Sequence, residues 1–250
     1  IGIIKRLLTE EQPITYESDW FKLNEALLHL KPYTKPHFPM AVAAAQSPSG
    51  MVAAGKHGLG VLSVSVVRGG AITSNLGDFW KIAEDTAEEY GNTMDRKEWR
   101  LVVGVHLAES KKEALNQARE KSASFQYDYF HKTLGTEFEY DGPRSGIVDY
   151  MVDSGAWCVG TPDDLIAKIH ELDEITGGFG GFLIQANEWG TSEQVKRSYE
   201  LLARYVMPHF QGSLENIVTS QKWSEDNRDK LGALRTKAYD KASADFRSRS

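Results

Sequence analysis

The residues best suited to chemistry lie in the short turn Ser47-Pro48-Ser49-Gly50, which follows an apolar run and precedes a helical pattern. Proline is favoured at a first helical position, so we expect a helix that begins at Pro48 with Ser47 as its N-cap. The N–H groups of Ser49 and Gly50 then point outward, and free N–H groups at a helix N-terminus favour an anion such as phosphate. The serine hydroxyls add donors, and Gly50 lets an anion approach the backbone. Taken alone, these four residues are more often an ordinary helix cap.

Other polar candidates lie at the ends of predicted elements. His106 lies near the end of one apolar run and Asn187-Glu188-Trp189 follows another, and parallel-strand folds place their sites at the carboxyl ends of strands. A lone strand histidine is more often structural, and packing at the rim explains Glu188 beside Trp189 as well as ligand contact does. His57, at a predicted helix end, is best explained as a cap. No two of the seven histidines stand three or four residues apart, so no metal site is predicted.

These candidates lie within a repeated alternation of strand and helix patterns. Short apolar runs predict strands at 40–45, 59–65, 99–107 and 181–185, the first of them buried on both faces. Helical patterns follow at 48–57, 78–90, 111–132, 162–177 and 192–205, and Thr161-Pro162 is a clear helix start. A glycine-rich segment at 68–77 is long enough to be a binding loop. Repeated βα units predict a parallel α/β sheet, either half of an eight-stranded barrel or a small open sheet.

The two ends of the chain differ from this alternating region. Residues 1–8 have an amphipathic helical pattern without an initiating methionine, so we expect a truncated start. Strand-like runs at 14–16 and 20–23, joined by a Ser-Asp turn, predict a hairpin. Residues 213–250 are charged, with sparse apolar positions, and we expect a tail after a first domain of residues 1–212.

Composition limits the class of protein. The 250 residues are 41% hydrophobic and 26% charged, as in soluble globular proteins. The 29 basic and 35 acidic residues give a net charge of −6, which disfavours nucleic acid and anionic membrane surfaces as partners. No apolar run approaches the roughly 18 residues of a membrane helix. The single cysteine, Cys158, fits a reducing cytoplasm, and we expect a buried, unreactive thiol.

Four segments, in order along the chain, resemble the luciferase-like flavin monooxygenases of the bacterial luciferase superfamily, and within it the limonene 1,2-monooxygenase type. The matching segments are residues 38–63, 159–164, 177–184 and 198–210. Each is weak alone, but together they cover the chain up to about Gly212. The resemblance implies a TIM (β/α)8 barrel of which this chain supplies the C-terminal two-thirds and lacks the N-terminal strands.

The resemblance also implies a cofactor site and a reaction. It assigns Ser47, Ser49, Gly50 and, more weakly, Gln46 to the phosphate of reduced FMN. The family takes reduced FMN from a separate flavin reductase and uses O2 to oxygenate a small hydrophobic substrate. Its catalytic histidine lies in the early strands, so no catalytic residue is predicted in this chain.

Two alternatives stay open. One is an oxidoreductase of the same barrel that uses the deazaflavin F420, because both cofactors carry a phosphate. The other is a non-catalytic flavin-binding or structural fragment. Since an incomplete barrel leaves a sheet edge open, we also expect a homodimer.

Overall fold

The computed structural model describes residues 1–45, 47–65, 76–135, 140–213 and 215–248. Gln46 and residues 68–75 of the glycine-rich segment lie outside these described residues. The chain divides into two compact units, residues 1–199 and 200–250, and each is described by itself.

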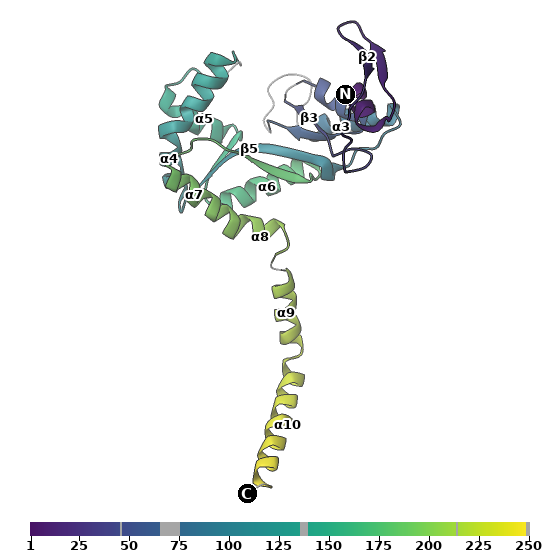
Figure 1. Cartoon of the computed structure of the whole chain (residues 1–250). Coiled ribbons are helices and arrows are strands. Elements are labelled where there is room, and N and C mark those ends of the chain that lie inside the picture. Colours follow the sequence, from purple (N-terminus) through teal and green to yellow (C-terminus); the bar gives the residue numbers. More distant parts are fainter. Residues whose placement is uncertain (46, 66–75, 136–139, 214, 249–250) are drawn as a thin grey trace. The chain divides into compact units, whose positions relative to one another are not determined.

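Helices and strands alternate along most of the chain (Figure 1). Up to the start of the second unit they are α1 (Gly2–Thr9), β1 (Ile14–Glu17), β2 (Lys22–Ala26), β3 (Ala41–Ala44), α2 (Ser49–His57), β4 (Gly60–Ser63), α3 (Leu76–Glu89), η1 (Arg96–Glu98), β5 (Trp99–Leu107), α4 (Lys111–Ser124), η2 (Phe125–Thr133), η3 (Arg144–Gly146), α5 (Ile147–Asp153), β6 (Trp157–Gly160), α6 (Pro162–Thr176), β7 (Gly181–Gln185) and α7 (Ser192–Leu201). The remaining elements are η4 (Leu202–Val206), α8 (Met207–Phe210), α9 (Glu215–Asp226) and α10 (Arg228–Arg247).

The main sheet is parallel and open in the part of the chain that is described. Its strands follow the order β3-β4-β5-β6, and β7 also pairs with β5. The prediction of a parallel α/β sheet is therefore confirmed. The strand β6 was not predicted, because its four residues are too few to show a periodic pattern and stand directly before the helix start at Thr161.

The first strand of this sheet is less buried than its sequence predicts. Ala41 and Ala43 are exposed and only Ala44 is buried, so the expectation of burial on both faces is wrong here. The physical reason is the position of the strand, since among the described strands β3 pairs with β4 alone and lies at the end of the sheet. An edge strand keeps one row of backbone groups unpaired.

A pair of stacked tryptophans fixes one end of the core. The rings of Trp80 in α3 and Trp99 in β5 lie 4.6 Å apart with an interplanar angle of 19°, and both side chains are fully buried. The indole Nε1 of Trp99 donates a hydrogen bond of 2.9 Å to Ser63 Oγ. This hydrogen bond satisfies the buried indole N–H of Trp99 and the buried hydroxyl of Ser63, as buried polar groups require.

Several local predictions are confirmed. α1 forms at the N-terminus, and β1 and β2 pair antiparallel in a separate two-stranded sheet. β2 begins at Lys22, two residues later than predicted. Thr161 caps α6 with Pro162 at its start, and Asp164 completes a capping box by accepting the N–H of Thr161 at 2.8 Å.

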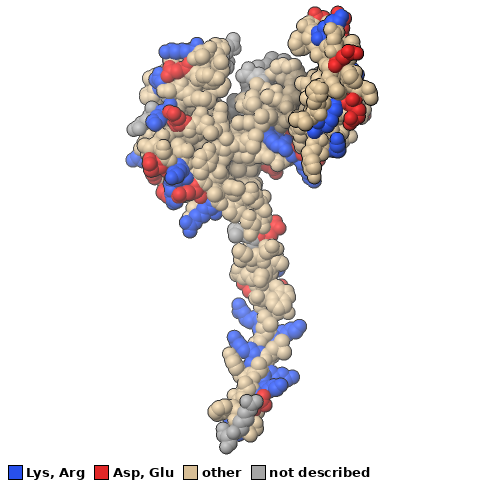
Figure 2. All heavy atoms as spheres, viewed as in Figure 1, with Lys and Arg blue, Asp and Glu red and all other residues tan. Residues whose placement is uncertain are grey.

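The second unit ends in two exposed helices. α10 carries six basic and three acidic residues in the sequence RDKLGALRTKAYDKASADFR, and Figure 2 shows lysine and arginine side chains along this helix. No residue of α9 or α10 is buried within the described part of the chain. The predicted boundary after residue 212 falls between α8 and α9, inside this unit.

None of the described helices has the length and apolar character needed to cross a lipid bilayer.

The close packing of α2 against α3 gives the first testable prediction. A Cβ atom on Gly55 would lie 2.8 Å from Thr86 Cβ and would also meet the backbone oxygen of Ala83. We expect Gly55→Ala to force the two helices apart and to lower the free energy of unfolding by about 1–3 kcal/mol. The measurement is chemical denaturation of the whole chain.

Gly232→Ala in α10 is the matched control, because a Cβ there meets nothing within 4 Å. Alanine in an exposed helix is favoured over glycine, so this variant should not destabilise the protein. Equal stability of the Gly55→Ala variant and the unchanged protein would contradict the packing of α2 on α3.

Candidate functional site

The turn after β3 brings two serine hydroxyls together. Ser47 Oγ lies 2.8 Å from Ser49 Oγ and accepts the backbone N–H of Ser49 at 3.2 Å. Both side chains are exposed. α2 begins at Ser49 with Pro48 as its N-cap, one residue later than predicted, although Ser47 still bonds the first turn of the helix.

The free donors of this turn are not quite those expected from the sequence. The N–H of Ser49 is satisfied by Ser47, so it does not point outward. The N–H of Val52 reaches Pro48 O at 2.9 Å. Among the described residues, no acceptor is recorded for the N–H groups of Gly50 and Met51. Two N–H groups and two hydroxyls at a helix N-terminus form a donor set that fits a phosphate group.

Gly50 has a packing role that its sequence did not show. A Cβ atom at this position would lie 2.9 Å from Ala44 Cβ and 3.1 Å from Ala43 O. The absence of a side chain therefore lets the start of α2 lie directly against β3. This contact is enough to explain the glycine, and its role in anion approach stays a prediction. Gln46, the fourth predicted cofactor residue, lies outside the described residues.

His106 is fully buried near the carboxyl end of β5. Its Nε2 lies 2.8 Å from Gln117 Oε1 of α4, and its ring stacks on that of Trp189 at 6.1 Å. Its Nδ1 has no hydrogen-bond partner among the described residues. Burial lowers the pKa of His106, although the hydrogen bond to Gln117 acts in the opposite direction. These contacts favour the structural interpretation of a neutral histidine.

The segment Asn187-Glu188-Trp189 is anchored by its tryptophan. Trp189 is buried and packs edge-to-face on Trp157 of β6, with ring centroids 4.9 Å apart. The buried atoms Asn187 Nδ2 and Trp189 Nε1 have no partner among the described residues. Glu188, between them, is exposed. Trp189 thus takes the packing role that the sequence left open, while Glu188 stays available for a ligand.

At the C-terminus of α2, where the sequence predicts a cap at His57, Lys5 and Asn92 bond the last carbonyl groups; Asn92 Nδ2 donates to Gly55 O at 3.1 Å and to Lys56 O at 2.9 Å. Gly58 adopts a left-handed conformation with φ 58°, and Lys5 Nζ donates to His57 O at 2.9 Å. Burial lowers the pKa of the His57 imidazole, and nearby positive groups, including Lys56 and Lys5, lower it further. The cationic side chain that stabilises this helix end is therefore Lys5.

Cys158 in β6 is buried, as expected. Burial is the main cause that raises the pKa of its thiol to about 12. A thiol with so high a pKa forms little thiolate and is a poor nucleophile.

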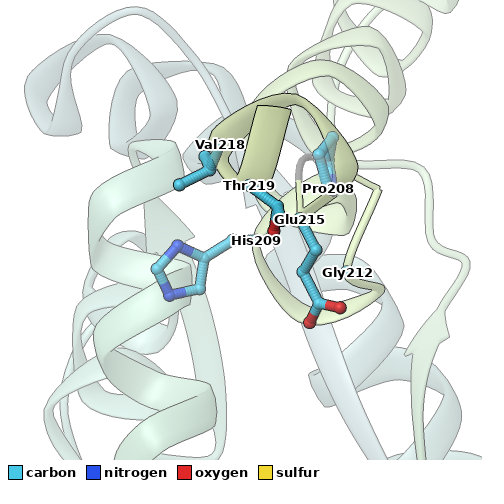
Figure 3. Close-up of a pocket in the computed structure, with 6 residues that line it drawn as sticks. All are labelled: Pro208, His209, Gly212, Glu215, Val218 and Thr219. Carbon is cyan, nitrogen blue, oxygen red and sulfur yellow. The ribbon is translucent and has the colours of Figure 1, made fainter. Parts of the chain in front are cut away.

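Two further features were considered as sites. In the second unit, a hollow of about 440 Å³ is lined by residues that include His209 and Glu215. Figure 3 shows the imidazole and the carboxylate pointing in different directions, so the two groups do not face a common ligand atom. Among the described residues, no group of three or more His, Cys, Asp or Glu side chains is placed to hold a metal ion.

Comparison with known proteins places this geometry in context. The sequence profile of the luciferase-like monooxygenases matches residues 1–177. The chain is 36% identical over 239 residues to 4-hydroxyprotoasukamycin monooxygenase of Streptomyces nodosus subsp. asukaensis, covering 94% of this chain and 64% of that protein. It is 37% identical over 212 residues to limonene 1,2-monooxygenase of Rhodococcus erythropolis, covering 85% of this chain and 53% of that protein. The chain thus spans less than two-thirds of each relative.

Solved structures share the fold. The oxygenating constituent of 3,6-diketocamphane monooxygenase from Pseudomonas putida, solved with FMN, has a TM-score of 0.62 at 22% identity, and the match covers 83% of this chain and 61% of that one. An F420-dependent secondary alcohol dehydrogenase has a TM-score of 0.56 at 19% identity, and the match covers 82% and 58%. At such low identity, the likeness shows the fold alone.

The burial of His106 gives a prediction about pH. Its pKa is lower in the folded protein than in the unfolded chain, so the unfolded chain takes up a proton first as the pH falls. The free energy of unfolding should therefore decrease between about pH 7 and pH 5. We expect His106→Gln to reduce this pH dependence, measured by urea denaturation at each pH. The control is His29→Gln, at an exposed position, and it should keep the pH dependence of the unchanged chain. If the free energy of unfolding changes with pH by the same slope in the unchanged chain and in His106→Gln, the buried, neutral state of His106 is contradicted.

Proposed function

Because this chain belongs to the luciferase-like monooxygenase family, we propose that the complete protein is an FMN-dependent monooxygenase. It takes reduced FMN from a flavin reductase and uses O2 to oxygenate a small hydrophobic organic molecule. The observation that carries this proposal is the set of donors at the start of α2, where two exposed hydroxyls lie 2.8 Å apart and no acceptor is recorded for the N–H groups of Gly50 and Met51 among the described residues.

The chemistry of this cluster suits a flavin phosphate. Ser47 and Ser49 would donate their hydroxyl hydrogens, and the N–H groups of Gly50 and Met51 would add backbone donors next to the positive end of the helix dipole. When bound, reduced flavin supplies the electrons for O2 activation. The protein's part is to hold the phosphate, orient the ring and exclude water.

The names of the relatives support the reaction class. Two relatives that are 36% and 37% identical are named monooxygenases, and a solved structure of the same fold holds FMN. We assign no catalytic residue among the described residues. We propose a cytoplasmic location, as the single cysteine suggests.

Two alternatives have their own support. F420 in place of FMN is supported by the shared fold of an F420-dependent dehydrogenase, and the donors of the turn suit either phosphate. A non-catalytic flavin-binding or structural role for this chain alone is the other alternative, and the matches cover 64% and 53% of the two relatives. Binding titrations with FMN and with F420 distinguish the cofactors.

A double substitution tests the phosphate site. We expect Ser47→Ala with Ser49→Ala to weaken FMN binding by about tenfold, because the two exposed hydroxyl hydrogen bonds together contribute about 1.4 kcal/mol. Binding of riboflavin, which lacks the phosphate, should change little. Flavin fluorescence titrations measure both constants. Gly50 is not substituted, because a side chain there would disturb α2 and β3.

The control is Ser220→Ala with Ser224→Ala on the exposed helix α9. This pair should keep the preference of the chain for FMN over riboflavin. If the Ser47 and Ser49 variant also keeps that preference, the turn does not bind the phosphate.

The open edge of the sheet supports the proposal of a homodimer. β3 pairs only with β4, and its exposed Ala41 and Ala43 leave apolar surface uncovered. We expect light scattering after gel filtration to give twice the mass of one chain. A well-folded monomer would contradict this expectation and would weaken the half-barrel interpretation.

A further inference from the structure

A second cleft lies between the end of α4, the π-helix η2 and the loop after β7. Its volume is about 380 Å³, and it is lined by Lys121, Ser124, Phe125, Asp128, Tyr129, Thr133 and Glu188. The first six share one face of the continuous helix, and Glu188 faces them from the loop. π-helical turns are rare and occur often at functional sites.

The apolar part of the cleft consists of two aromatic rings. Phe125 and Tyr129 stack with centroids 5.9 Å apart and an interplanar angle of 20°, and Tyr129 is 48% exposed. The half-buried ring of Phe125 and the exposed ring of Tyr129 offer a surface on which another ring can pack by offset or edge contact.

The charged residues of the cleft differ in whether they have a partner. Arg144 holds Asp128 through both carboxylate oxygens, at 2.6 and 3.2 Å, and this hydrogen bond lowers the pKa of Asp128. For Lys121 and Glu188, no hydrogen bond or ion pair to any described residue is recorded, and the two do not pair with each other across the cleft. The cleft therefore offers one free donor and one free acceptor beside the rings.

The cleft also lies at the end of the sheet that is formed by the carboxyl ends of its strands. Glu188 follows β7 by three positions, as Ser47 follows β3 by three positions. β3 and β7 are parallel strands of one sheet, so their carboxyl ends meet the same edge. The phosphate turn and the cleft thus open on the side where α/β folds place their sites.

We propose that this cleft binds the molecule to be oxygenated, a ring compound that carries a carbonyl group and a hydroxyl group. Its ring packs on Phe125 and Tyr129, Lys121 donates to the carbonyl oxygen, and Glu188 accepts the hydroxyl hydrogen. The identification of this ligand as the substrate rests on the proposed monooxygenase function, whereas its binding does not.

Isothermal titration of the full chain with 4-hydroxyacetophenone tests the cleft, since this probe has the ring, the carbonyl and the hydroxyl. We expect binding that Lys121→Met and Glu188→Gln each weaken by about tenfold. Lys112→Met is the matched control, because Lys112 is exposed on the same helix but does not line the cleft. Acetophenone, which lacks the hydroxyl, should bind equally to the unchanged chain and to Glu188→Gln.

FMN binding, measured on the same proteins, separates this inference from the proposed function. The cleft variants should leave FMN affinity unchanged. If FMN binds and 4-hydroxyacetophenone does not, the cleft proposal is overturned while the cofactor proposal stands. The same holds if FMN binds and the affinity for 4-hydroxyacetophenone is unchanged in Lys121→Met and Glu188→Gln. If the probe depends on both residues but FMN does not bind, the cleft is supported and the monooxygenase function is not.

Discussion

The pairing of β5 is the interaction on which the rest of residues 1–199 depends. Its first residues pair with β4, its last residues pair with β6, and β7 joins its middle. From Val103 to Leu107 every residue is buried. Each end of the strand has its own tryptophan contact, Trp99 with Trp80 at the start and Trp157 over Gly104 toward the end. A side chain on Gly104 would lie 2.6 Å from the Trp157 ring, so the join between β5 and β6 depends on that glycine.

This arrangement decides where ligands can bind. Parallel strands present all their carboxyl ends at one edge, and the loops that leave that edge carry Ser47 and Glu188. Below these loops, the ring of Trp189 stacks on the buried imidazole of His106. Burial lowers the pKa of this imidazole and favours its neutral form. The loop after β7 is therefore anchored by the ring contacts of Trp189 with Trp157 and His106, while Glu188 beside it is exposed.

Those parts of the structure that depend on local chemistry could be predicted from the sequence. The helix start at Thr161-Pro162 and the turn before α2 form from neighbouring residues, and both were predicted, although α2 begins one residue later than expected. Burial of β3 was not predictable, because it depends on which strands lie beside it. The cleft at η2 was missed as well, because it joins residues near 125 to Glu188, and only the folded chain brings them together. The spacing of Phe125 and Tyr129 was visible, but in a helical pattern it is typical of packing as much as of binding.

The atoms of the turn at Ser47 suit the proposed role in phosphate binding and not a role in proton transfer. Every group that it offers is a hydroxyl or an N–H donor, which suits an anion but cannot remove a proton from a substrate. Gly50 serves the contact of α2 with β3, so this donor set is held in place by packing. A rigid donor set can hold the phosphate of a cofactor while the reacting part of the molecule lies elsewhere. The carboxylate of Glu188 lies in the loop after β7, and the ammonium of Lys121 lies across the cleft in α4; neither has a recorded partner in the described part of the chain. Under the two proposals, cofactor binding and substrate recognition belong to loops that follow different strands of one sheet, an arrangement in which the substrate cleft can change without loss of the phosphate site.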